Sequence, residues 1–259
     1  MKNAIKSAML SGRRVLGTFN ELGSEIAMEC LGYSGLDFAI IDAEHGPFDA
    51  ETALNFVRAA KYSGITPLVR VKDGNRNSIL KMLDVGTMGL IIPNVRSLDE
   101  VKDIVKFGKY FPLGERGVAP TPGSNYWTSD YASHGLERYF EVSNSETLLI
   151  PQCETKGCLD AIEQIAAVDG VDGIFLGPYD LSTALGKPGQ FSDPEMTGAV
   201  RRILKACKDA KKFAFIYAGN EAAAEEDFKM GFDAVALNMD SIILINAYKD
   251  IVARLRPSK

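Results

Sequence analysis

The chain has 259 residues, of which 46% are hydrophobic and 24% charged, and its formal net charge is −5. This composition predicts a soluble globular protein with a large core, and it excludes a disordered or membrane-embedded chain. The acidic balance and the lack of a Lys/Arg run exclude an electrostatic surface for nucleic acid or anionic lipid.

Short apolar runs alternate along the chain with amphipathic helical stretches, which is typical of βαβ units around a parallel sheet. Eight such runs span residues 15–19, 38–42, 67–71, 89–93, 147–154, 173–177, 214–218 and 234–238. Eight strands alternating with helices predict an α/β fold, a single (β/α)8 TIM barrel domain over residues 1–259.

Helix start signals support this order of elements. Asp49 precedes one helical stretch, Ser97 and Glu100 form a capping-box pattern before another, and Asp193 with Pro194 opens a third. The last helical stretch, residues 241–255, is apolar enough to pack on another subunit.

The polypeptide carries no secretory signal and no run of about 18 apolar residues, so we expect a cytoplasmic protein. Its four cysteines lack the spacing of a zinc site or redox motif, and we expect reduced thiols. Residues 111–146 are longer than a usual helix-to-strand loop, which indicates a functional or interface segment.

Polar residues stand where several of the apolar runs stop, and in a (β/α) barrel the active site lies at those carboxyl ends. They are Asp42, Glu44, His45, Arg70, Gln152, Glu154, Asp180, Asn238 and Asp240. Strand alternation places Gln152 and Glu154 on one face and Cys153 on the other. It also points Arg70 inward, which is costly unless an anion meets the guanidinium.

Each of these residues also has a purely structural interpretation. His45 can hold the turn at Gly46, Arg70 can pair with Asp42 or Glu44, and Glu154 and Asp180 can cap the helices that follow them. Convergence of a base, a cation and two carboxylates on one opening favours a functional site.

The ligand types indicate which cofactor such a site would take. Two carboxylates and the Gln152 carboxamide, without thiolates, suit a hard divalent cation such as Mg²⁺ or Mn²⁺. The Gly177-Pro178 turn can present backbone N–H groups to a substrate carboxylate.

Six strings of the sequence, DFAIIDAEHGPFD, PLVRV, MLDVGTMGLIIPNV, GERGV, QCET and VDGIFLGPYDLS, occur in this order. As a set they resemble the HpcH/HpaI family of metal-dependent pyruvate aldolases, over about residues 15 to 250. The resemblance implies a class II aldolase that reversibly cleaves a 4-hydroxy-2-oxo acid to pyruvate and an aldehyde through a metal-bound enolate. It also implies a homohexamer, a trimer of dimers, with an exchanged C-terminal helix.

The resemblance further implies roles for particular residues. Glu154 and Asp180 would hold the metal, Mg²⁺ or Mn²⁺ with Co²⁺ or Zn²⁺ as alternatives, and Gln152 would lie near its water shell. Arg70 would contact the pyruvate keto oxygen. Backbone N–H groups around Tyr179 and Asp180, in the turn that begins at Gly177 and Pro178, would bind the carboxylate. His45, oriented by Asp42, would serve acid/base chemistry, with Glu44 in support and Asp84 near a subunit interface.

One segment departs from the family pattern. After GERGV this chain has APTPGSNYWTSDY, where family members carry Ala- and Arg-rich sequence that borders the aldehyde pocket. We therefore expect residues 111–146 to govern aldehyde choice and subunit contact, and the sequence does not predict the aldehyde itself.

Other functions compete with this interpretation. A Schiff-base aldolase needs a desolvated lysine at the barrel mouth, and only Lys72 and Lys156 are near. A CoA-thioester lyase of the citrate lyase β type, or an oxaloacetate decarboxylase, can use the same enolate. A non-catalytic barrel that binds a 2-oxo acid would be favoured by loss of a metal carboxylate or the base, and all three residues are present.

Overall fold

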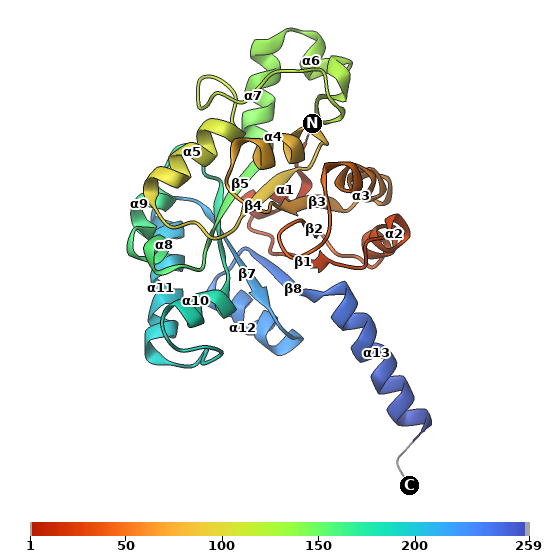
Figure 1. The fold of residues 1–259 in the computed structure, drawn as a ribbon, viewed down its shortest axis with the longest axis vertical. Coiled ribbons are helices and arrows are strands. Elements are labelled where there is room, and N and C mark those ends of the chain that lie inside the picture. The colour runs from red at the N-terminus through yellow and green to blue at the C-terminus, as the bar shows by residue number, and fades with distance from the viewer. Residues whose placement is uncertain (1, 257–259) are drawn as a thin grey trace.

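The structure is a computed structural model and describes residues 2–256. Eight parallel strands form a closed barrel in sequential order, and β8 pairs with β1 (Figure 1). The strands are β1 (Val15–Asn20), β2 (Phe38–Asp42), β3 (Thr66–Arg70), β4 (Gly89–Ile92), β5 (Leu148–Cys153), β6 (Gly173–Leu176), β7 (Phe213–Ala218) and β8 (Ala234–Met239). The predicted (β/α)8 barrel is confirmed, with each predicted strand end within one residue of the observed end.

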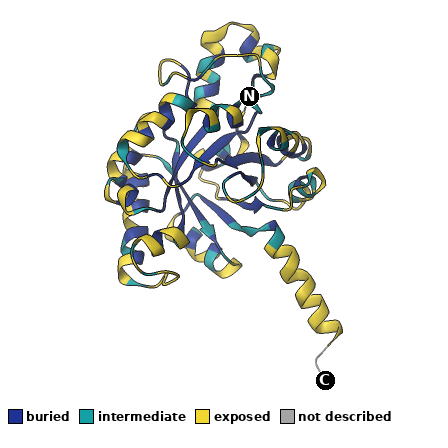
Figure 2. Cartoon of the chain, in the orientation of Figure 1, coloured by how far each residue is buried: buried dark blue, intermediate teal, exposed yellow. Residues whose placement is uncertain are grey.

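The helices lie outside the barrel, and most of them bury one face, whereas the last helix projects away from it (Figure 2). They are α1 (Ala4–Leu10), α2 (Glu25–Tyr33), α3 (Ala50–Ser63), α4 (Arg76–Asp84), α5 (Leu98–Gly108), η1 (Pro122–Trp127), α6 (Asp130–Ser133), α7 (Leu136–Glu146), α8 (Lys156–Asp160), α9 (Ile162–Ala166), α10 (Pro178–Ala184), α11 (Pro194–Asp209), α12 (Glu221–Met230) and α13 (Asp240–Leu255). Asp49 and Asp193 cap α3 and α11 as predicted. The capping box predicted at α5 is half formed. The Glu100 N–H donates to the Ser97 hydroxyl, but the Glu100 carboxylate accepts from the Arg96 N–H and not from that of Ser97.

Side chains alternate between the barrel interior and the helices. Leu68 packs inside with Phe38 and Phe175, whereas Val69 and Cys153 pack outward against the helix layer. This is the alternation expected for strands buried on both faces. Arg70, two residues after Leu68, is therefore carried to the mouth of the barrel at the carboxyl ends of the strands.

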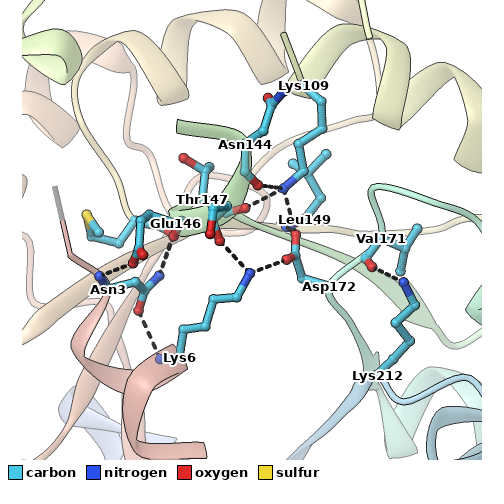
Figure 3. Close-up of polar contacts among 12 residues, drawn as sticks. Asn3, Lys6, Lys109, Asn144, Glu146, Thr147, Leu149, Val171, Asp172 and Lys212 are labelled. Atoms are coloured by element: carbon cyan, nitrogen blue, oxygen red, sulfur yellow. Dashed lines mark hydrogen bonds and ion pairs between the residues drawn. The ribbon is translucent and has the colours of Figure 1, made fainter. Parts of the chain in front are cut away.

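A buried ion-pair network closes the opposite, amino-terminal end of the barrel (Figure 3). Lys109, only 1% exposed, donates from Nζ to the carbonyls of Asn144 (2.9 Å) and Thr147 (2.6 Å) and to Oδ2 of Asp172 (2.8 Å). Lys6 of α1 donates to Oδ1 of the same Asp172 at 2.7 Å. Burial lowers the pKa of Lys109, and the carboxylate of Asp172 counters this effect. The network joins α1, α5, α7 and the start of β6.

Replacing Lys109 by methionine should lower the free energy of unfolding by about 3 kcal/mol, because two buried carbonyls lose their donor while Asp172 keeps Lys6. Urea denaturation measures the change. Lys102→Met is the control, since the Lys102 side chain is 59% exposed and, within the described residues, pairs only with Asp99. This substitution should lower the free energy of unfolding by less than about 1 kcal/mol. Equal effects of the two substitutions would contradict the role given to the network.

The long connection from α5 to β5 contains η1, α6 and α7 and lies beside the N-terminus (Figure 1). It packs around an aromatic cluster in which the rings of Tyr110 and Phe140 stack at 4.6 Å. An ion pair of 3.1 Å from Arg116 to Asp84 fastens it to α4. This helix-to-strand connection lies at the end of the barrel opposite the carboxyl ends of its own strands. The expectation that residues 111–146 govern aldehyde choice and subunit contact stays a prediction, and a second copy of the chain would have to bring the segment to the pocket.

Helix α13 extends away from the barrel and is exposed along its length (Figures 1 and 2). Its exposed apolar side chains are Ile242, Ile243, Leu244, Ile245, Tyr248, Ile251, Val252 and Leu255. An apolar surface of this size on a projecting helix indicates an interaction site. Among residues 2–256, no helix combines the length and hydropathy needed to cross a membrane.

Candidate active site

A cavity of about 280 Å³ opens at the carboxyl ends of the strands. Of the residues predicted for the site, it is lined by His45, Arg70, Gln152, Gly177, Pro178, Tyr179 and Asp180. Asp42, Glu44 and Glu154 lie directly behind this lining, in contact with Arg70 or Gln152. Asp84 does not belong to the group, because it ends α4 at the other end of the barrel.

Arg70 is held by two carboxylates beneath the cavity. Its Nε donates to Oδ1 of Asp42 at 2.8 Å, its Nη2 donates to Oδ2, and Glu44 lies 3.4 Å from Nε. Asp42 is fully buried, and although burial opposes ionisation, the guanidinium of Arg70 holds the pKa of Asp42 below its usual value. The structural interpretation of Arg70 is therefore partly right. The pairing leaves Nη1 without a partner among the described residues and available to a ligand.

Asp42 also shapes the loop that carries His45. Its Oδ1 accepts from the backbone N–H groups of Glu44 (3.1 Å) and His45 (3.4 Å). The His45 side chain is exposed at the cavity, and no residue from 2 to 256 hydrogen-bonds its imidazole ring. Asp42 thus positions the backbone of His45, whereas orientation of the ring by Asp42 stays a prediction.

Glu154 and Gln152 form a buried polar pair at the base of the site. Glu154 is 6% exposed, its Oε1 accepts the Asn94 N–H at 2.6 Å, and its Oε2 accepts from the amide of Gln152. Burial, reinforced by the neighbouring carboxylates of Asp180 and Glu44, raises the pKa of Glu154 to about 7. The carboxamide Oε1 of Gln152 is buried without a partner. The carboxylates of Glu154, Asp180 and Glu44 lie close enough to repel one another, and a cation bound between them would relieve this repulsion.

The backbone at Gly177 is fitted to this pair. A Cβ atom there would lie 2.7 Å from Oε2 of Glu154 and 2.8 Å from Nε2 of Gln152, so any other residue would displace the carboxylate. Thr155 caps α8, and Gly177 is the N-cap residue of α10. Glu154 and Asp180 therefore do not serve as N-cap residues, so the interpretation of these two residues as helix caps is wrong.

These residues fit a hard divalent cation. No three His, Cys, Asp or Glu side chains within residues 2–256 are grouped to enclose a metal, so a full protein cage is absent from the described chain. Mg²⁺ characteristically takes one or two carboxylates and keeps its remaining ligands for water and substrate. Glu154 and Asp180 could supply the two carboxylates, and Oε1 of Gln152, which has no partner among the described residues, could accept from a water of the ion's shell.

Sequence reasoning missed the apolar wall of the cavity. Phe19, Phe175, Tyr217 and Met239 also line it, with the Phe19 ring 6.1 Å from Phe175 and 6.0 Å from Tyr217. The guanidinium carbon of Arg70 lies 4.7 Å from the centroid of the Phe19 ring. Strand alternation could have placed Phe19 at the mouth, because it follows Val15 and Gly17 on the inward face.

Two predicted strand-end residues are structural. Asp240 accepts from the side chain of Asn20 (2.8 Å) and from the backbone of Glu21 (2.8 Å), which fastens the start of α13 to the end of β1. Asn238 donates to the carbonyl of Gly219 at 3.0 Å, with its own backbone at a positive φ of 51°.

The two lysines considered for a Schiff base do not line the 280 Å³ cavity. Lys72 is exposed and borders a neighbouring cavity, and Lys156 pairs with Asp160 on the surface of α8. A Schiff-base mechanism therefore has no candidate nucleophile at this site among the described residues.

The sequence profile of the HpcH/HpaI aldolase/citrate lyase family matches residues 16–247. The chain belongs to this family. It is 31% identical over 252 residues to a hydroxypyruvate/pyruvate aldolase of Roseobacter denitrificans, covering 97% of this chain and 96% of that protein. It is also 31% identical over 255 residues to a 4-hydroxy-2-oxo-heptane-1,7-dioate aldolase of Shigella sonnei, covering 98% and 95%.

A solved HpcH/HpaI aldolase from Desulfitobacterium hafniense superposes with a TM-score of 0.91 at 26% identity, covering 100% of this chain and 98% of that one. The fold and the family match are both those of HpcH/HpaI aldolases, and the polar residues lie at the mouth of the barrel, where (β/α)8 enzymes have their active sites. The protein is an enzyme, and the aldolases it resembles are carbon–carbon lyases.

Proposed function

We propose that the protein is a metal-dependent class II aldolase that reversibly cleaves a 4-hydroxy-2-oxo acid to pyruvate and an aldehyde. The observation that carries this proposal is the convergence, at one cavity, of an oxygen-donor pair, Glu154 and Asp180, with Arg70 and His45. The names of the aldolase relatives support the reaction class.

Glu154 and Asp180 would hold Mg²⁺ or Mn²⁺, and the bound ion would act as a Lewis acid towards the keto and carboxylate oxygens of the substrate. Arg70 donates from its free Nη1 to the keto oxygen, where negative charge develops. Backbone N–H groups at Tyr179 and Asp180 bind the substrate carboxylate. The wall of Phe19, Phe175 and Tyr217 excludes water from the reacting carbons.

In the cleavage direction, His45 takes the proton of the 4-hydroxyl group as the bond between C3 and C4 breaks. The hydroxyl-bearing carbon leaves as an aldehyde, and the electron pair of the broken bond passes to the enolate of pyruvate. Arg70 stabilises the enolate oxygen, and a proton added at C3 gives pyruvate. An imidazole suits this work because it gains and loses a proton near neutral pH.

Metal removal tests the proposal. Pyruvate release from a panel of 4-hydroxy-2-oxo acids should stop after dialysis against EDTA and return with Mg²⁺ or Mn²⁺, because the carboxylates alone cannot stabilise the enolate. Oxaloacetate belongs in the panel, since its decarboxylation needs only the enolate half of the site. Activity that survives chelation and is destroyed by borohydride in the presence of pyruvate would contradict the proposal and indicate a Schiff base.

We also propose that α13 packs against a neighbouring copy of the chain in a hexamer formed as a trimer of dimers. The exposed apolar side chains of α13, at positions 242–245, 248, 251, 252 and 255, support this proposal. Multi-angle light scattering of the full chain measures the assembly, and a monomer at micromolar concentration would contradict it.

A further inference from the structure

Glu21 lies beside the Asp42–Arg70 pair although it belongs to none of the motifs that defined the site. It directly follows β1, and its backbone N–H donates to Oδ1 of Asp240 at 2.8 Å. The register pairs Asn20 with Ile41, so the next residue of each strand, Glu21 and Asp42, comes together. Asp240 thus fixes the backbone from which Glu21 reaches Asp42.

The register places the Glu21 side chain against that of Asp42, close enough for a hydrogen bond between the two carboxyl groups, and Oε1 of Glu21 is buried with no hydrogen-bond partner among residues 2–256. Two ionised carboxylates have no proton to share, so one of the two must be the acid. Asp42 accepts two charge-assisted bonds from Arg70 and is held as the anion. Glu21 therefore carries the proton and donates it.

The charges around Glu21 agree with this assignment. Burial, the hydrogen bond to Asp42 and the negative charge of Asp42 raise the pKa of Glu21 to about 7, with Arg70 opposing and Asp240 adding to the increase. These groups come from β2, β3 and the start of α13. Glu44 also faces Arg70, at 3.4 Å, so the single guanidinium already serves two carboxylates without Glu21.

We propose that Glu21 is a positioning residue, which as a neutral carboxylic acid donates a hydrogen bond to Asp42 and holds the Asp42–Arg70 pair in place. This inference rests on the aldolase function proposed above. When Glu21 loses its proton, a second negative charge meets Asp42, and the guanidinium of Arg70 is drawn towards Glu21 and away from the substrate oxygen.

The first test compares pH profiles of kcat/KM for the Mg²⁺- or Mn²⁺-loaded protein. Wild-type activity should fall as the pH rises through about 7, and Glu21→Gln, whose amide donates without titrating, should lose this fall. Glu21→Ala should be reduced about 10-fold at all pH values, because Arg70 is misplaced. Glu25→Gln, on the exposed first turn of α2, is the matched control and should follow the wild type.

His45 and Glu154 are present in every one of these proteins, so a difference between wild type and Glu21→Gln reports Glu21 alone. A Glu21→Gln profile that keeps the wild-type fall would overturn the inference. So would a Glu21→Ala protein with unchanged kcat/KM.

The second test needs no substrate and separates this inference from the proposed function. A carboxyl group whose pKa rises on folding stabilises the fold below pH 4.5, and this stabilisation is lost as the pH rises to about 7. Urea denaturation should show a larger loss between pH 4.5 and about 7 for wild type and Glu25→Gln than for Glu21→Gln, which keeps the contributions common to all three proteins, such as those of Glu154 and Asp227. If the protein is an active aldolase but the stability of wild type and of Glu21→Gln depends on pH in the same way, the role of Glu21 is refuted and the proposed function stands. Divergent profiles in a protein without aldol or decarboxylase activity would refute the proposed function and leave the Glu21 hydrogen bond standing.

Discussion

Replacing Arg70 by lysine should lower kcat/KM for aldol cleavage by about 10²- to 10³-fold, although the positive charge is kept. The guanidinium reaches Asp42 through Nε and Nη2 at once, which leaves Nη1 to meet the developing negative charge on the substrate. A lysine has one nitrogen for all of these partners. That ammonium would stay with the fully buried Asp42, and the keto oxygen would lose its donor.

Steady-state kinetics on Arg70→Lys measure this loss, and oxaloacetate decarboxylation should fall with aldol cleavage because both pass through the enolate. Arg58→Lys is the control for exchanging an arginine for a lysine, because Arg58 is exposed on α3, and this substitution should leave kcat/KM unchanged. A near-normal kcat/KM in Arg70→Lys would reduce Arg70 to the structural partner of Asp42 and Glu44.

Strand periodicity explains how much of the site the sequence could predict. Because side chains alternate with a period of two, the run ending at Arg70 could be divided from the sequence alone into inward Leu68 and Arg70 and outward Val69. The same rule paired Gln152 with Glu154. Strand order then brought residues more than a hundred positions apart in sequence to one cavity.

The site residues that the sequence did not predict were overlooked for specific reasons. Searching strand ends for polar groups overlooks apolar ones, so Phe19 and Tyr217 were not found. Glu21 lies two residues past the predicted run 15–19, as Glu44 lies two residues past the run 38–42, so the same search applied to the first strand could have included it. What the sequence could not predict is the contact between Glu21 and Asp42, since this depends on the register between the ends of β1 and β2.

The place of residues 111–146 in a single chain follows from connectivity. The segment joins α5 to β5, and any such connection begins and ends at the amino-terminal end of the barrel. The pairing of Arg116 with Asp84 is consistent with that location. A role at the aldehyde pocket would require another copy of the chain to bring the segment there.

Substitutions of His45 and Glu154 should separate proton transfer from metal binding. His45→Ala should lower the aldol kcat by about 10²- to 10⁴-fold, the usual contribution of a general acid/base group, with little change in metal affinity. The His45 ring is exposed at the cavity and hydrogen-bonds none of the described residues. In the wild type Glu154 accepts the Asn94 N–H at 2.6 Å, and Glu154→Gln keeps an acceptor for this group but loses the negative charge. It should therefore lower the metal affinity, and the activity should fall only as a consequence.

Calorimetric titration with Mn²⁺, run beside aldol assays at saturating metal, distinguishes the two roles. High metal concentration should restore part of the activity of Glu154→Gln and none of that of His45→Ala, because only the former acts through occupancy. His134→Ala is the matched control, since the second histidine is exposed at the end of α6 and, among residues 2–256, its ring hydrogen-bonds only Ser133 and Asp130 of that helix. A His45→Ala protein that no longer binds Mn²⁺ would make His45 a ligand, and the proton transfer assigned to it would have to come from another group.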